Sequence, residues 1–124
     1  MEKCLHTALL VSDLERAEYF YSHVLGLTKV ERELKFPGVW YQIGEFQIHL
    51  IVDANFKPRL ANQDKWGRNP HIAFAVKNLQ LVRESLAGYG STIQFSSSGR
   101  AALFVQDPDG NVIEVSEITH GVTR

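Results

Sequence analysis

Apolar and other side chains alternate in two stretches of the chain, HTALLV at residues 6–11 and HIAFAV at residues 71–76. A period of two is typical of a half-buried strand, because successive side chains of a strand point to opposite faces of its sheet. In residues 14–24 and 79–86, apolar positions recur at helical spacing instead. The pattern therefore predicts a strand followed by a helix at two places.

Capping residues give bounds to the two predicted helices. Ser12 with Glu15 three positions later resembles a capping box, which predicts that the first helix begins after Ser12. Asn78 is a favoured cap for the second helix, and Gly88 and Gly90 are expected to end it.

Short segments rich in β-branched and aromatic residues follow each predicted helix. Turn residues separate them, most clearly in DPDG at residues 107–110, where proline and glycine suit a tight turn. The predicted strands are residues 28–34, 39–43 and 45–52 after the first helix, and 92–95, 101–106 and 111–117 after the second. The order βαβββ is therefore predicted twice.

Two similar halves of this kind indicate a duplicated unit. HTALLVSDLERA at residues 6–17 and HIAFAVKNLQLV at residues 71–82 align with His, Ala, Val and Leu in common. We expect one domain over residues 1–124, with module one at about 1–53, a linker or pocket-covering loop at about 54–68, and module two at about 69–120.

Composition supports one compact domain that acts on small molecules. The 124 residues are 44% hydrophobic and 22% charged, with a net charge of −1 and no long basic run. Nucleic acid and anionic membranes normally require a basic surface, so neither is an expected partner. The short apolar run at the N-terminus suits neither a signal peptide nor a membrane span, and we expect a cytoplasmic protein. Cys4, the single cysteine, allows no intrachain disulfide and is expected to be a buried thiol.

The repeat also places chemistry-bearing side chains at matched positions. It aligns His6 with His71 and His49 with Glu114, so each module has one candidate on its first strand and one on its last. Strand alternation puts the small Ala73 on the face of His71 and sends His49 and Glu114 away from their apolar neighbours. We expect all four candidates to line one concave surface.

Three neutral imidazoles and one carboxylate are a suitable ligand set for a divalent ion such as Zn, Ni, Co or Mn. Four protein ligands in a six-coordinate shell leave two positions for water or substrate. The sequence thus predicts a metal site formed by His6, His49, His71 and Glu114.

The chain resembles the vicinal oxygen chelate superfamily, which includes glyoxalase I, bleomycin-resistance proteins and extradiol dioxygenases. The resemblance rests on LHTALLVSDLERAEYFYSHVLGL, PHIAFAVKNL and LFVQDPDGNVIEVSE, which together span nearly the whole chain. It implies an α+β fold of two tandem βαβββ modules that form a cupped, incomplete-barrel mixed sheet with the helices outside. It also implies metal ligands on strands one, four, five and eight, which correspond to His6, His49, His71 and Glu114.

Within the superfamily the chain looks most similar to bacterial glyoxalase I, the lactoylglutathione lyase. That resemblance implies a metal-dependent lyase or isomerase that converts a hemithioacetal through an enediolate, with one Ni, Zn, Co, Mn or Fe ion per site and Glu114 as the catalytic base. Two positions depart from the family: His49 replaces a glutamate, and Leu10 replaces the arginine that holds the glutamyl group of glutathione. The implied substrate is therefore a small molecule such as a thiol adduct, and the identity of the thiol stays open.

The sequence leaves other activities of the superfamily open. An extradiol dioxygenase would bind Fe(II) with His6, His71 and Glu114 alone, and a thiol transferase would need a cationic cluster such as Arg59, Arg68 and Arg100. A drug-binding resistance protein would need none of the ligands. Ser96–Arg100 could hold an anion or be an ordinary loop. The family also implies a homodimer, with the site either within one chain or shared by two.

Overall fold

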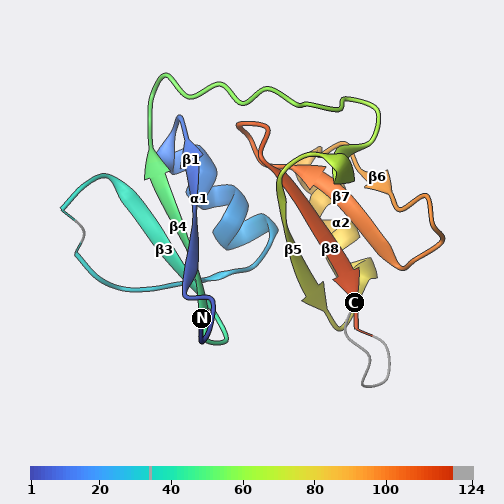
Figure 1. The fold of residues 1–124 in the computed structure, drawn as a ribbon, viewed down its shortest axis with the longest axis horizontal. Helices are drawn as coiled ribbons and strands as arrows, with labels where there is room; N and C mark the ends of the chain where they lie inside the picture. Colours follow the sequence, from blue (N-terminus) through green and yellow to red (C-terminus); the bar gives the residue numbers. More distant parts are fainter. Residues whose placement is uncertain (34, 119–124) are drawn as a thin grey trace. The chain divides into compact units, whose positions relative to one another are not determined.

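The computed structural model describes residues 1–33 and 35–118. They form two compact units, residues 1–57 and the residues from 58 onward (Figure 1). Each unit has one mixed four-stranded sheet and a helix, and neither sheet closes into a barrel. The predicted α+β class and the doubled βαβββ order are confirmed. Residues 119 and 120, which the sequence assigns to module two, lie outside the described part.

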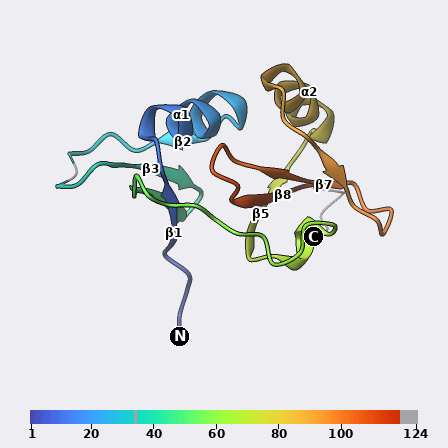
Figure 2. The same ribbon diagram turned by 90° about the horizontal axis from the view of Figure 1, so that it is seen from above.

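The first unit has its strands in the order β1-β4-β3-β2. β1 pairs with β4 in parallel, and the other pairs are antiparallel. Figure 2 shows the helical segment on one face of this sheet. The elements are β1 (His6–Val11), α1 (Leu14–Tyr19), the π-helix η1 (Phe20–Val24), β2 (Thr28–Lys29), β3 (Gly38–Ile43) and β4 (Phe46–Val52).

The second unit repeats this topology, with its strands in the order β5-β8-β7-β6. β5 pairs with β8 in parallel. Figure 2 shows α2 on one face of the sheet and the turn η2 on the other. The elements are the 3₁₀ turn η2 (Trp66–Arg68), β5 (His71–Val76), α2 (Leu79–Tyr89), β6 (Gln94–Phe95), β7 (Ala102–Gln106) and β8 (Val112–Glu117). None of the helices among the described residues is long and apolar enough to cross a membrane.

Strand alternation separates the core from the candidate ligands, as predicted. Ile48 and Leu50 on β4 are fully buried, and so is Ile113 on β8, while Val115 is nearly so. Burying such side chains contributes about 1.5–3 kcal/mol each. Because neighbouring positions of a strand face opposite ways, burial of these residues directs His49 and Glu114 to the other face of each sheet.

The first helix begins one residue later than predicted. Asp13, rather than Ser12, caps α1: its carboxylate accepts a hydrogen bond of 3.0 Å from the backbone N–H of Arg16. The Ser12 hydroxyl instead accepts a hydrogen bond from the Arg16 guanidinium. Asp and Ser are comparable caps, so adjacent candidates compete and geometry decides between them. The Asn78 cap of α2 is confirmed.

Three other local predictions were wrong, wholly or in part. Gly88 does not end α2, which continues through it, whereas the predicted end at Gly90 is confirmed: its φ of 95° is the left-handed conformation that glycine tolerates. The predicted strand at 28–34 is reduced to β2, Thr28–Lys29, with one further backbone hydrogen bond from Val30 to Trp40; residue 34 lies outside the described residues. Cys4 precedes β1 and is exposed rather than buried.

Candidate functional site

A histidine and a carboxylate face each other on the second sheet. His71 begins β5, and Glu114 lies on β8, where its register partners are Ala73 and Phe104. The Nε2 atom of His71 is 3.3 Å from Oε1 of Glu114. Only 13% of the Glu114 side chain is exposed. Ala73, the register partner of Glu114, lies on the same face of β5 as His71.

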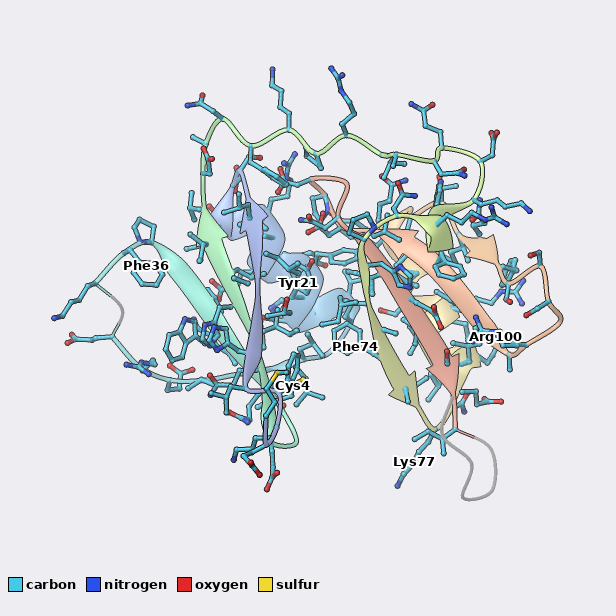
Figure 3. All side chains as sticks on the ribbon, viewed as in Figure 1. Cys4, Tyr21, Phe36, Phe74, Lys77 and Arg100 are labelled. Carbon is cyan, nitrogen blue, oxygen red and sulfur yellow. The ribbon has the colours of Figure 1, made fainter. Side chains whose placement is uncertain are left out.

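The other carboxylate oxygen of Glu114 is occupied by two donors. The Ser116 hydroxyl donates a hydrogen bond of 3.0 Å to Oε2, and Nη1 of Arg100 donates one of 3.4 Å to the same atom. Figure 3 labels Arg100 in this unit. These donors hold the carboxylate plane, so Oε1 is the oxygen that is presented to a ligand.

The His71 ring is oriented from behind by Asn69. Nδ1 of His71 is 2.7 Å from the backbone carbonyl oxygen of Asn69, which can only accept, so Nδ1 carries the proton. Asn69 is itself buried, and its amide group bonds to the backbone carbonyls of Asn62, Lys65 and Trp66. The remaining nitrogen, Nε2, is therefore the one that can bind a ligand.

The spacing of this pair suits two ligands of one ion. Two donor atoms that each lie about 2.1 Å from a shared ion, at an angle of about 90–110°, are about 3.0–3.4 Å apart. The observed 3.3 Å between Nε2 of His71 and Oε1 of Glu114 lies in this range. Second-sphere partners on both residues, the Asn69 carbonyl and the Arg100–Ser116 donors, are also typical of metal ligands.

The two candidate histidines of the first unit are part of a stack of planar groups. The rings of His6 and His49 lie 4.1 Å apart at 13°, and the rings of His49 and Trp40 lie 3.8 Å apart at 3°. The guanidinium carbon of Arg32 lies 4.1 Å from the centre of the Trp40 ring. The indole N–H of Trp40 is buried without a hydrogen-bond partner among the described residues. Stacking rather than hydrogen bonding therefore holds Trp40.

A chain of amides determines which nitrogen of His49 carries its proton. Nε2 of Gln42 donates to the backbone carbonyl of Gly44, which leaves Oε1 of Gln42 to accept from Nε2 of Gln47. Oε1 of Gln47 then faces Nε2 of His49 at 2.8 Å and can only accept. His49 is therefore protonated at Nε2, and its Nδ1 carries the free lone pair.

The environment of His49 also favours its neutral form. Burial lowers the pKa of His49 from its ordinary value of 6.5, and the neighbouring His6 and Arg32 lower it further. A neutral imidazole is the form that binds metal. However, the lone pairs of an imidazole lie in the ring plane, so two nearly parallel rings cannot both point at one ion. The first pair fits a shared metal only after the ring of His6 or of His49 turns.

The structure thus forms two pairs of candidate ligands, one in each unit. Across residues 1–33 and 35–118, no group of three or more His, Cys, Asp or Glu side chains gathers to hold a metal ion. Convergence of His6, His49, His71 and Glu114 on one ion stays a prediction.

Sequence patterns did not assign a role beside either pair to Gln47, Asn69 or Arg32. Gln47 and Trp40 share the face of His49 by strand alternation, so the period of two could have indicated them. Asn69 lies just before β5 in an irregular segment, and Arg32 lies between β2 and β3. No periodic signal marks either position.

A model of the Glyoxalase/Bleomycin resistance protein/Dioxygenase superfamily matches residues 3–115, which is most of the chain. The chain belongs to this superfamily. The doubled βαβββ topology agrees with the membership.

Relatives within the superfamily are similar over nearly their full length. The lactoylglutathione lyase of Haemophilus influenzae is 29% identical, with 91% of this chain and 90% of that protein covered. The lactoylglutathione lyase of Salmonella typhimurium is 27% identical, covering 93% and 92%. The crystal structure of a glyoxalase family protein from Bacillus anthracis superposes with a TM-score of 0.77 at 24% identity, covering 96% and 97%. This last likeness shows the fold alone.

Proposed function

We propose that the protein is a divalent-metal-dependent enzyme that isomerises a hemithioacetal, or a related α-hydroxycarbonyl compound, through an enediolate. The observation that carries the proposal is the His71–Glu114 pair, whose 3.3 Å spacing suits two ligands of one ion. The lactoylglutathione lyases among the relatives support the reaction class.

In this proposal His71 and Glu114 hold the metal together with His6 and His49, once one ring of the first pair has turned. The ion would be Ni, Zn, Co, Mn or Fe, and the mixed nitrogen and oxygen donors suit any of them. When bound, such an ion polarises substrate oxygens and stabilises negative charge that develops on them.

Glu114 is the proposed base. Its Oε1, when not bound to the ion, would take a proton from one carbon of the substrate, and the electrons of that C–H bond would form the enediolate. Oε1 would then return the proton to the adjacent carbon, while the substrate's hydroxyl proton moves to the former carbonyl oxygen, so the isomerisation needs no oxidant or reductant. Arg100 and Ser116 hold Oε2 during both transfers, so the same oxygen stays directed at the substrate.

The decisive experiment measures isomerisation of hemithioacetals made from methylglyoxal and several thiols, with the protein loaded with each metal in turn. Glu114→Gln should reduce kcat by about 10²–10⁴-fold, because the amide cannot accept the transferred proton. Glu84→Gln, an exposed glutamate on α2, is the matched control and should keep the wild-type rate. Absence of turnover with every thiol and metal would contradict the proposal.

The constraint on His49 favours a second candidate function. If its stack and its bond to Gln47 keep His49 away from the ion, His6, His71 and Glu114 remain, which is the facial set of extradiol dioxygenases. Cleavage of catechols by the Fe(II)-loaded protein, without hemithioacetal turnover, would support this alternative.

We also propose that the chain forms a cytoplasmic homodimer, by analogy with the superfamily. A sedimentation-equilibrium mass of two chains is the expected result, and a mass of one chain would contradict it.

A further inference from the structure

The second unit contains a cavity of about 380 Å³ beside the turn η2. On one side it is lined by Asp64, Lys65, Gly67 and Arg68, and on the other by β6 and the two serines that follow it. Phe104 on β7 also lines it. The cavity is therefore formed by residues of the second unit alone.

Hydrogen bonds hold the chain segment that forms the cavity wall opposite β6. The side-chain oxygen of Gln94 accepts from the backbone N–H of Trp66, and its amide nitrogen donates to the backbone carbonyl of Asp64. Asn69 ties the same segment from the other end through the carbonyls of Lys65 and Trp66. Hydrogen bonds within the protein therefore hold this wall in place.

Close packing of Gly67 against the Phe104 ring fixes the floor of the cavity. A Cβ atom on Gly67 would lie 2.7 Å from Cζ of Phe104, so η2 rests directly on this ring. Phe104 is buried, and its ring meets that of His71 edge to face, with 5.7 Å between the ring centres. The cavity and the His71–Glu114 pair therefore share Phe104 as a common wall.

The lining offers donors and positive charge. Lys65 and Arg68 are exposed, and neither forms an ion pair with a carboxylate among the described residues. Ser96 and Ser97 supply hydroxyl groups on the other side, where the Ser96 hydroxyl also shares a hydrogen bond of 2.9 Å with that of Ser98. Among the described residues of the lining, Asp64 is the one acidic side chain. With two cationic side chains and one carboxylate, these lining residues carry a net positive charge.

From this arrangement we propose that the cavity binds an anionic oxygen group, a carboxylate or a phosphate, at one end of the substrate. Lys65 and Arg68 supply charge-assisted hydrogen bonds, and the serine hydroxyls orient the oxygens. Ser96–Arg100, which the sequence left open as an anion site or a loop, then has a role through its first two residues. That the reacting end of the same molecule lies at Glu114 rests on the proposed function; anion binding by the cavity does not.

The test titrates inorganic phosphate, and separately succinate, into the ¹⁵N-labelled protein at constant ionic strength. We expect saturable shifts of the amide resonances of residues 64–68 and 94–97. Arg68→Gln should weaken binding about tenfold, the effect of losing one charge-assisted contact. Lys77→Gln removes one positive charge outside the lining and should change the affinity less than about twofold. The tighter of the two probes identifies the anion as phosphate or carboxylate.

His71→Ala separates this inference from the proposed function. It should abolish metal binding but leave the phosphate or succinate affinity within about twofold, because His71 does not line the cavity. Absence of saturable shifts with both probes would overturn the inference even if the isomerase is active. Equal weakening by Arg68→Gln and Lys77→Gln would also overturn it, since that result indicates general charge attraction.

Discussion

His71 and His49 carry their protons on different ring nitrogens. His71 donates from Nδ1 to the Asn69 carbonyl, whereas His49 donates from Nε2 to Gln47. In each case the partner can only accept, because a backbone carbonyl terminates the chain of hydrogen bonds. His71 therefore offers Nε2 to a ligand and His49 offers Nδ1.

Replacing the acceptor Gln47 should remove the preference of His49 for carrying its proton on Nε2. Gln47→Met keeps the approximate side-chain length and removes Oε1, so the two neutral tautomers of His49 become closer in population. Imidazole ¹⁵N resonances above pH 8 measure this directly. In the wild type we expect His49 protonated at Nε2 and His71 at Nδ1, and only His49 should change in the variant. A His49 protonated at Nδ1 in the wild type would contradict the amide chain.

Residue types at repeated strand positions could be predicted, but their hydrogen-bond partners could not. The repeat placed His6, His49, His71 and Glu114 correctly on β1, β4, β5 and β8. It could not show that His6 and His49 stack, because ring orientation depends on Trp40 and Arg32, which come from other segments.

At the scale of elements, long periodic segments were predicted better than their ends. Strand alternation gave β1, β5 and the buried faces of β4 and β8. The turn η2 carries no such pattern, and its position is determined by tertiary contacts: the Asn69 and Gln94 hydrogen bonds and the packing of Gly67 on Phe104.

The same Gly→Ala change should have opposite effects in two elements. Gly67→Ala places a methyl group against the Phe104 ring and should lower the free energy of unfolding by about 1–3 kcal/mol. Gly88→Ala, within α2, meets nothing within 4 Å and should raise it by about 0.5–1 kcal/mol through helix propensity. Urea unfolding measures both. An unchanged or raised stability of Gly67→Ala would show that η2 does not rest on Phe104.

At the scale of the whole molecule, the duplication accounts for the site as well as the fold. Each unit places one candidate ligand on its first strand and one on its last, and parallel pairing of these strands brings the two together. The spacing of the second pair suits the proposed metal, while the first pair is held in a ring stack that would have to open for both histidines to bind it.

Metal content of the protein purified without chelators tests whether the chain binds a divalent ion. We expect about one divalent ion per chain in the wild type and almost none in His71→Ala, because loss of one ligand removes most of the affinity. His23→Ala, which replaces an exposed histidine of η1, should retain the ion. A wild-type protein that holds no metal and takes up none of Ni, Zn, Co, Mn or Fe would contradict the account, as would full metal content in His71→Ala.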